Sequence, residues 1–419
     1  MRNKVLEFTF KTFHLIFYTL IGLVIAVNLF IVLSGRFYIY KGMVNTYFKG
    51  KLGPGIYDLD VFPYSTLKRS TKPYIWQKSE NYNEFEQSKE IQRLNRLTET
   101  AALLVIKDDK LVYEKYYGEH HSETLSNSFS AAKTIVSLLV GVALQEGYIK
   151  SLDQKVSEFI PEFKKESTKD ITLRNLLQMS SGLNWQESGK NPLSENAESY
   201  FGTDLYGLVT RQNGIQEPGK KLVYQSGNSQ LLGFIVSKTT GKTLSKYAQE
   251  KIWQKIGSDA NAHWSLDKKK GSEKAFCCIY ARARDFAKLG KLIAQKGEWE
   301  GETLISKEYM KEMFTPNQNL ITEENTVNNR YGLHIWVYQD GEDQVVYCRG
   351  ILGQYIVVIP EKNLIFVRLG HKRMTNVSPI DCQKSDNEGE IFTPDQMGHP
   401  RDFFSYLKFA REAAGESEI

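Results

Sequence analysis

Cysteine is scarce in this sequence: the 419 residues include four, too few for a disulfide-stabilised scaffold. No two of them have the Cys-x-x-Cys spacing of a zinc site, and the seven histidines are scattered along the chain. We therefore expect neither a metal nor another cofactor. The adjacent Cys277 and Cys278 are interpreted as small apolar side chains of the core.

An excess of charge of one sign is also lacking. The 54 Lys and Arg residues nearly balance the 49 Asp and Glu residues, which leaves a formal net charge of +5. The one basic run, Lys268 to Lys270, precedes Gly271 and is typical of a solvated turn. The charge pattern therefore argues against a nucleic-acid partner. A hydrophobic content of 41% argues against disorder.

Charged residues are absent from Phe13 to Leu33, and almost every residue in that stretch is apolar. Its length matches the roughly 20 residues that a helix needs to cross a bilayer. Arg2, Lys4 and Lys11 precede it, as in the basic flank of an export signal. We expect an uncleaved signal anchor in a bacterial membrane, with the rest of the chain on the extracytoplasmic side. A cleaved signal and a buried core helix are the alternatives.

The rest of the chain divides by its periodicity. We expect a transmembrane anchor over residues 1–34, a juxtamembrane connector over 35–95 and one globular domain over 96–419. Alternating apolar residues predict strands near both ends of that domain, at 101–106, 111–116, 334–338, 345–348, 354–359 and 364–368. Helical patterns fill its middle. The order predicts an α/β (α+β) fold with an antiparallel sheet flanked by helices and an inserted, mostly helical sub-domain at about 149–270.

Ser130 and Lys133 stand where a polar turn enters an apolar stretch, which predicts a buried helix ending near Gly147. Three residues apart, their side chains share one face of a helix. A buried amine beside a hydroxyl can take its proton and activate it as a nucleophile. The Ser-x-x-Lys pattern alone is weak, because the sequence contains it three more times. An ordinary helix cap at Ser130 is the alternative.

Further motifs follow in a recognisable order. They are Leu176-Leu177-x-Met179-Ser180-Ser181-Gly182-Leu183, Tyr224-Gln225-Ser226, Trp264-Ser265-Leu266-Asp267, Tyr280-Ala281-Arg282-Ala283-Arg284-Asp285 and Gly350-Ile351-Leu352-Gly353-Gln354. With Ser130 and Lys133, this series resembles the beta-lactamase-related serine hydrolases, the class C beta-lactamase-like group that includes penicillin-binding proteins. Within that group it is most similar to the 6-aminohexanoate-dimer hydrolase-like branch. The resemblance covers roughly residues 96–375.

The resemblance implies a beta-lactamase/transpeptidase-like fold with its site in the cleft between the α/β part and the helical part. It implies that Ser130 is the acylated nucleophile, Lys133 its base and Tyr224 the relay of the proton to the leaving group. Ser226 takes the third place of the second motif, within reach of Lys133 or Tyr224. The N–H groups of Ser130 and of the strand near Ile351 would form the oxyanion hole.

Two departures from the group narrow the expected activity. Class C beta-lactamases carry Tyr-x-Asn where this sequence has Ser226, and their Lys-Thr-Gly is replaced by Arg349-Gly350-Ile351. Hydrolysis of beta-lactams is therefore not expected. Arg349 is interpreted either as a site for a substrate carboxylate or as a solvated charge on a strand. Trp185 and Trp264 are interpreted as core residues, with a place in the lining of the cleft as the alternative. Arg282, Arg284 and Asp285 are interpreted as a structural cluster.

Taken together, the sequence predicts a membrane-anchored serine hydrolase that cleaves an amide or ester bond through an acyl-enzyme on Ser130. Its expected partners are a small-molecule or peptide substrate and the membrane. A D,D-peptidase that acts on cell-wall peptides is one alternative. A non-hydrolytic acyl-accepting or binding protein of the same fold is the other.

Overall fold

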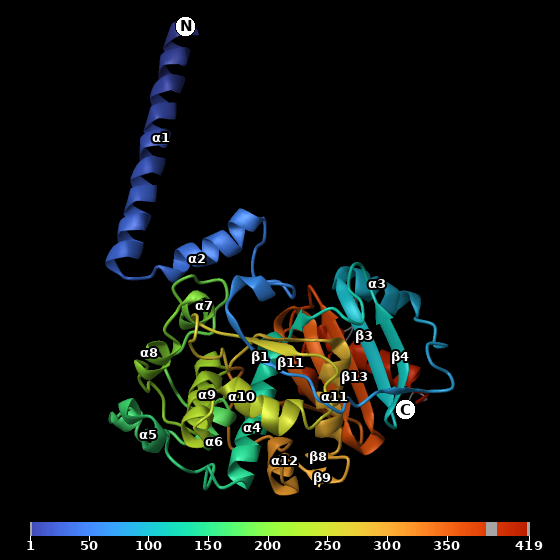
Figure 1. Cartoon of the computed structure of the whole chain (residues 1–419). Coiled ribbons are helices and arrows are strands. Elements are labelled where there is room, and N and C mark those ends of the chain that lie inside the picture. Colours follow the sequence, from blue (N-terminus) through green and yellow to red (C-terminus); the bar gives the residue numbers. More distant parts are fainter. Residues whose placement is uncertain (1, 383–391, 417–419) are drawn as a thin grey trace.

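A seven-stranded sheet forms the centre of the computed structural model, which describes residues 2–382 and 392–416 (Figure 1). Its strand order is β10-β11-β12-β13-β3-β4-β2, antiparallel except where β2 runs parallel to β4. The strands are β2 (Gln77–Lys78), β3 (Thr100–Lys107), β4 (Lys110–Tyr116), β10 (Trp336–Asp340), β11 (Asp343–Gly350), β12 (Gln354–Ile359) and β13 (Leu364–Gly370). The predicted antiparallel sheet, built from both ends of the domain, is confirmed.

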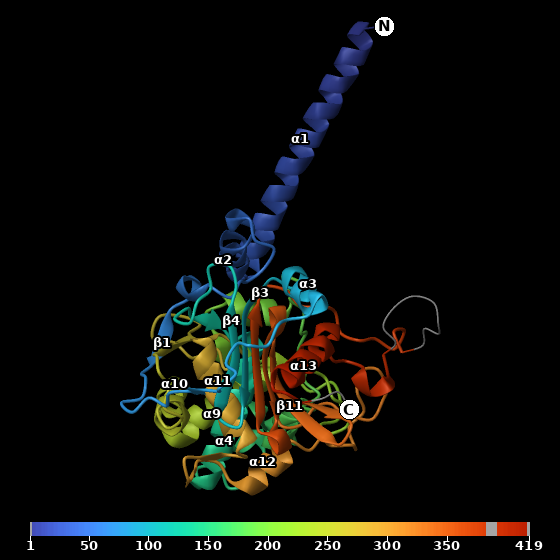
Figure 2. The same cartoon turned by 90° about the vertical axis from the view of Figure 1, so that its right-hand side faces the viewer.

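Both faces of this sheet are covered, which explains why its central strands are apolar on both sides. Alternate residues of each strand point in opposite directions, so Ile356 and Val358 pack in one core and Tyr355 and Val357 in the other. On the first face lie α4 (Ala132–Gln145) and α11 (Ala283–Ala294), as Figure 2 shows. On the second lie α3 (Lys89–Leu97) and α13 (Arg401–Ala413).

The middle of the chain is mostly helical and lies beside α4 (Figure 1). Its helices are α5 (Val156–Phe159), α6 (Leu173–Leu177), α7 (Glu195–Phe201), α8 (Leu205–Thr210), α9 (Ser226–Thr240) and α10 (Leu244–Ala248), and a π-type turn follows at Gln249–Trp253. Farther along the chain are β8 (Glu298–Trp299), β9 (Glu302–Thr303) and α12 (Lys307–Met313).

A second, four-stranded sheet joins the helical part to the main body. Its order is β1-β6-β7-β5, from β1 (Tyr64–Leu67), β5 (Ser126–Asn127), β6 (Ala262–Ser265) and β7 (Ile279–Ala281). The segment expected to be a connector thus contributes β1 to this sheet, and β2 and α3 to the larger body. Sequence periodicity missed these elements because two of the three are only two or four residues long.

The chain begins with one long helix, α1 (Arg2–Leu33), that leaves the body (Figure 1). Its segment Thr9–Leu33 is 25 residues long and apolar enough to cross a membrane, and a signal sequence near the N-terminus has the same character. A short helix, α2 (Tyr38–Asn45), follows and rests on the body.

Candidate active site

Ser130 lies in a 3-10 turn, Phe129–Ala131, between β5 and α4. The turn is fastened to β7, because Ser128 N–H donates to the Ile279 carbonyl (2.7 Å) and Ile279 N–H donates to Ser128 Oγ (3.1 Å). Phe129 has a φ of +44°, a left-handed conformation that bulky side chains rarely adopt. Such conformations persist only where the surrounding structure enforces them, so the residue before Ser130 is held rigidly.

Lys133 is buried, with 1% of its surface exposed, and its amine lies among three oxygen atoms. Its Nζ is 3.1 Å from Ser130 Oγ and 3.0 Å from Ser226 Oγ. The third oxygen is the Phe276 carbonyl, at 2.9 Å. No carboxylate lies within ion-pair distance of Lys133 in the part of the chain that the structure describes. The amine is therefore held by neutral oxygen atoms alone.

Ser226 begins α9 and links Lys133 to a carboxylate. Its hydroxyl donates to Glu187 Oε1 at 2.6 Å, and its backbone N–H donates to Glu187 Oε2 at 2.7 Å. The same Oε2 accepts the indole N–H of Trp185 at 2.8 Å. A hydroxyl has one proton to donate, so Ser226 Oγ can only accept from Lys133. Glu187 thus sets the direction of the Ser226–Lys133 hydrogen bond.

Tyr224 forms a half-buried wall beside this network. Lys133 Nζ lies 5.0 Å from the centre of its ring, and that ring stacks on Trp336 at 5.9 Å. The guanidinium of Arg349 lies on the same Trp336, 3.2 Å from a ring centre, and donates to the Gly398 carbonyl. Arg349 is therefore partly buried over an aromatic ring and is not the solvated strand charge that was one interpretation.

The strand end that precedes Ile351 lies against the Ser130 turn. A Cβ added at Gly350 would stand 2.3 Å from the carbonyl oxygen of Ser128, so only glycine permits this approach. Strand β11 ends at Gly350, and Ile351 follows directly with 45% of its surface exposed. The backbone of Ile351 is thus beside the turn that carries Ser130.

The loop Ile351–Gly353 is held from within by two buried side chains. Gln354 Nε2 donates to the Ile351 carbonyl (3.1 Å), and Arg368 Nη1 donates to the carbonyls of Leu352 (2.8 Å) and Gly353 (2.7 Å). Leu352 has a φ of +63° and packs against the cluster that contains Phe129, which is also left-handed. Both sides of the candidate oxyanion site are therefore rigid.

Cys277 and Cys278 form a disulfide between neighbouring residues. They are buried as expected, but their interpretation as simple apolar side chains is corrected by this bond. Phe276 precedes them and supplies the carbonyl that accepts from Lys133, while Trp264 Nε1 donates to the Cys277 carbonyl at 3.0 Å. The segment that positions the lysine is thus covalently constrained.

His334 is buried behind the site, where it has neutral partners. Nδ1 lies 2.8 Å from the Leu177 carbonyl and Nε2 lies 2.8 Å from Ser229 Oγ. Burial is the main cause that lowers its pKa to about 3. Its neutral ring donates from Nδ1 and accepts at Nε2, a structural arrangement between the helical part and α4, whose Thr134 hydroxyl donates to the His334 carbonyl.

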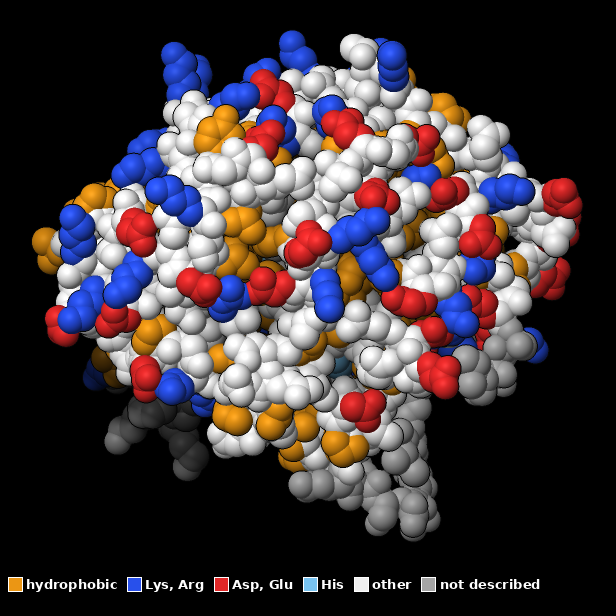
Figure 3. All heavy atoms as spheres, turned by 90° about the horizontal axis from the view of Figure 1, so that it is seen from below, with side chains coloured by type: hydrophobic (Ala, Val, Ile, Leu, Met, Phe, Trp, Pro, Cys, Tyr) orange, Lys and Arg blue, Asp and Glu red, His pale blue; other side chains and the backbone are white. Residues whose placement is uncertain are grey.

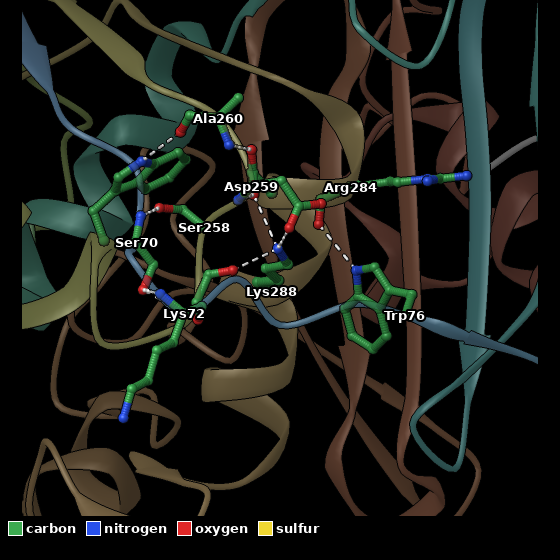
Figure 4. A network of polar contacts seen from close by, with 11 residues as sticks. Ser70, Lys72, Trp76, Ser258, Asp259, Ala260, Arg284 and Lys288 are labelled. Atoms are coloured by element: carbon green, nitrogen blue, oxygen red, sulfur yellow. Dashed lines mark hydrogen bonds and ion pairs between the residues drawn. The ribbon is translucent and has the colours of Figure 1, made fainter.

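The cluster at the start of α11 has partners that account for its charges. Arg284 makes two hydrogen bonds, each 2.7 Å, with Glu114, and its carbonyl accepts from the indole of Trp76 (Figure 4). Lys288 donates to the Asp259 carboxylate at 2.5 Å and to Asp285 at 3.3 Å. These contacts join α11 to neighbouring segments and agree with the interpretation of the cluster as structural.

Of the residues predicted from sequence, Ser130, Lys133 and Ser226 form one hydrogen-bonded group, with the Tyr224 ring beside it. Two further members of this group, Glu187 and Phe276, were not predicted from the sequence. Glu187 stands near the start of the polar stretch 186–217, two residues after Trp185, and its acidic side chain so close to a Trp was the one available signal. The described residues contain no group of three His, Cys, Asp or Glu that could hold a metal.

Three comparisons relate the chain to known proteins. The Beta-lactamase family model matches residues 89–386. The chain is 24% identical to the 6-aminohexanoate-dimer hydrolase of Paenarthrobacter ureafaciens, over 65% of this chain and 74% of that protein. It is 26% identical to a protein of Escherichia coli K12 named "Putative D-alanyl-D-alanine carboxypeptidase", over 37% of this chain and 41% of that protein.

A solved structure gives the same fold. It is described as "Putative 6-aminohexanoate-dimer hydrolase from Bacillus anthracis", and it superposes with a TM-score of 0.69 at 19% identity. The superposition covers 85% of this chain and 92% of that one. At this level of identity the likeness concerns the fold, and it confirms the beta-lactamase/transpeptidase-like architecture.

Proposed function

The chain belongs to the Beta-lactamase family, whose matched members include hydrolases, and we propose that it hydrolyses an amide or ester bond through an acyl-enzyme on Ser130. The observation that carries the proposal is the position of the buried Lys133 amine among three neutral oxygen atoms, one of which is Ser130 Oγ.

The hydrogen-bond inventory supports Lys133 as the base. A neutral primary amine has two N–H groups and one lone pair. The Phe276 carbonyl can only accept, and Ser226 Oγ, whose hydroxyl proton is donated to Glu187, can only accept from Lys133. Both N–H groups are then used, and the lone pair is left for the hydroxyl of Ser130. Glu187 acts in this scheme as a positioning residue for the proton transfer.

The proposed reaction has two halves. Ser130 Oγ attacks the substrate carbonyl while its proton passes to Lys133, and Tyr224 relays a proton to the departing amine or alcohol as the C–N or C–O bond breaks. Water then attacks the acyl-enzyme and gives its proton to the same pair. The new carboxylic acid leaves, and Ser130 regains its proton, so atoms and charge balance over the cycle.

The oxyanion of each tetrahedral intermediate is assigned to the N–H groups of Ser130 and Ile351. Support comes from the approach of Gly350 to Ser128 and from the anchoring of the Ile351–Gly353 loop by Arg368. Fixed donors need no reorganisation when charge develops, and loss of one such donor typically slows reactions about 100- to 1,000-fold.

The proposed substrates are small carboxylic esters, linear amides or peptides. The related proteins are named for a 6-aminohexanoate dimer and for D-alanyl-D-alanine. Arg349 replaces the Lys of the Lys-Thr-Gly motif, so the proposal excludes beta-lactams as preferred substrates.

A D,D-peptidase is the second candidate, and Arg349 is the observation that favours it. Its guanidinium lies on Trp336 and has no carboxylate partner among the described residues. A substrate with a terminal carboxylate would supply one. Parallel assays of a neutral ester and of a peptide that ends in D-alanyl-D-alanine distinguish the two candidates.

We also propose that α1 anchors the chain in a bacterial membrane with the catalytic body on the extracytoplasmic side. The 25-residue segment Thr9–Leu33, which is apolar enough to cross a membrane, supports this placement, because the helix extends away from the body and buries little of its surface there (Figure 1).

A fluorophosphonate probe tests the proposed chemistry. The full chain in detergent is exposed to the probe and its intact mass is measured, with Ser130→Ala and Tyr224→Phe in parallel. We expect one adduct in the wild type and none in Ser130→Ala. A folded wild-type protein that forms no adduct would overturn the hydrolase proposal and favour a binding protein of the same fold.

A further inference from the structure

The segment after α1 exposes a series of large apolar side chains. The most exposed are Phe37 (57%), Val44 (50%), Tyr47 (64%), Phe48 (74%) and Leu52 (94%). Phe37, the residue that caps α2 (Tyr38–Asn45), and Val44 are seven residues apart and lie on one side of that helix. Tyr47 and Phe48 follow in a separate 3-10 turn, Tyr47–Lys49, after a break at Thr46. A soluble surface rarely presents so many large apolar side chains within 16 residues of chain.

The opposite side of α2 packs on the body. The Tyr38 hydroxyl donates to the Pro192 carbonyl at 3.0 Å, and an added Cβ at Gly42 would contact the ring of Phe201 at 3.3 Å. Phe201 ends α7. Helix α2 therefore has two faces: one rests on α7, and the other has no covering element among the described residues.

Helix α2 is also tied to α1. The Tyr40 hydroxyl donates to Asn28 Oδ1 at 2.6 Å, which joins α2 to the last turns of the long helix. Only Ser34 to Phe37 separate the two helices, and Figure 1 shows α2 running across the foot of α1. The exposed face of α2 thus begins where the apolar segment Thr9–Leu33 ends.

We propose that residues 37–52 lie in the interfacial layer of the same bilayer that α1 crosses, with Phe37, Val44 and Phe48 in contact with lipid. This proposal rests on the membrane anchor proposed above and is independent of the hydrolase chemistry. Lipid is the expected contact because the chain is continuous. A helix that spans the bilayer and ends at Leu33 brings the residues four to 19 positions further along to the surface of that bilayer. Tyrosine and other aromatic rings favour that depth, and the exposed Lys49 adds attraction to anionic headgroups.

The far side of the body has a different surface. Figure 3, seen from the side opposite α1, shows Lys, Arg, Asp and Glu side chains scattered over that face between small apolar areas. This contrast agrees with a body whose side next to residues 37–52 contacts lipid and whose opposite side contacts water. Since α2 rests on α7, the membrane would also support the segment 186–201, which includes Glu187.

Photocrosslinking of the full chain in lipid vesicles tests the proposal. Three proteins each carry one p-benzoylphenylalanine, at Phe48, at Phe30 within the apolar segment, or at Tyr148, an exposed aromatic position after α4. Irradiation is followed by mass analysis for lipid adducts. We expect adducts at positions 30 and 48, each at least tenfold above position 148.

Three results would overturn the proposal: adducts at position 30 with none at 48 above the level of 148, adducts at neither position, or crosslinks from position 48 to a second copy of the chain. Labelling of Ser130 by the fluorophosphonate in the same samples reports the hydrolase chemistry separately. A protein that labels at Ser130 but fails at position 48 contradicts only the interfacial placement.

Discussion

Two fully buried lysines, Lys133 and Lys288, have opposite kinds of neighbours. Lys133 Nζ contacts two hydroxyl oxygens and one carbonyl. Lys288 Nζ contacts one carbonyl, that of Gly257, and the carboxylates of Asp259 and Asp285 (Figure 4). Both amines are buried and each makes three hydrogen bonds, so neither burial nor the number of hydrogen bonds distinguishes them. The difference lies in the charge of their partners.

Carboxylate partners stabilise an ammonium ion and keep its proton in place, whereas neutral oxygen atoms leave the amine free to exchange one. The environment of Lys288 therefore suits a structural ion pair, and that of Lys133 suits proton transfer. Burial raises the pKa of Asp285 and Lys288 opposes that effect, so each group in the structural network depends on its partner.

The same substitution at both lysines tests this difference most directly. Lys133→Met keeps the unbranched side chain up to Cε but removes the amine and with it the lone pair that faces Ser130. We expect hydrolysis of a p-nitrophenyl ester to fall about 10,000-fold, the upper range for loss of a general base. Circular dichroism checks that the variant is folded. A folded variant with more than a tenth of wild-type activity would contradict the assignment of Lys133.

Lys288→Met is the matched variant in the structural network. It leaves the buried Asp285 carboxylate without its cation, and breaking a buried pair in this way typically costs about 3–5 kcal/mol. We expect urea unfolding of the full chain in mild detergent to show a loss of that size. The folded fraction should keep ester hydrolysis within about twofold, since no partner of Lys288 contacts Ser130. Loss of activity with unchanged stability would contradict the structural role assigned to Lys288.

Sequence patterns identified the sheet and the Ser130–Lys133 pair because both depend on local spacing. Side chains alternate between the two faces of a strand with a period of two residues, and residues three apart lie on the same face of a helix. Glu187 and the Phe276 carbonyl were not found, because they reach Lys133 or Ser226 from 39 and 143 residues away along the chain. Such contacts depend on how segments pack. A backbone carbonyl carries no sequence signal at all.

The predicted roles of Tyr224 and Ile351 came from resemblance and remain predictions. The ring of Tyr224 lies over Lys133, and Ile351 follows the strand that approaches Ser128. Neither position could be derived from spacing, because residues 94 and 221 positions after Ser130 meet it only through the fold.

Glu187→Gln sharpens the comparison by changing the carboxylate that reaches Lys133 through Ser226. The amide of Gln can donate to Ser226 Oγ, so the hydroxyl proton of Ser226 is no longer fixed and can compete for the lysine lone pair. We expect kcat for the ester to fall about 30- to 100-fold with little change in KM. Glu195→Gln, which changes a carboxylate that accepts from the backbone N–H of Gln186, is the control. Equal losses in the two variants would contradict a positioning role.

His334 extends the comparison to a buried base whose ring nitrogens have neutral hydrogen-bond partners, the Leu177 carbonyl and the Ser229 hydroxyl. In the unfolded chain a histidine binds a proton at about pH 6.5, but in the folded protein burial lowers the pKa of His334 to about 3. The unfolded state therefore binds more protons, and the contribution of His334 to stability, complete above pH 6.5, is lost as the pH falls toward 3. Between pH 7 and pH 5 this loss amounts to about 2 kcal/mol.

Urea unfolding of His334→Gln tests this contribution, and we expect a pH dependence that is weaker by that amount. The control is Ser229→Ala, which keeps the imidazole and removes only its hydrogen bond, and it should retain the wild-type slope. A His334→Gln variant with the wild-type slope would show that the imidazole binds its proton as readily in the folded as in the unfolded protein.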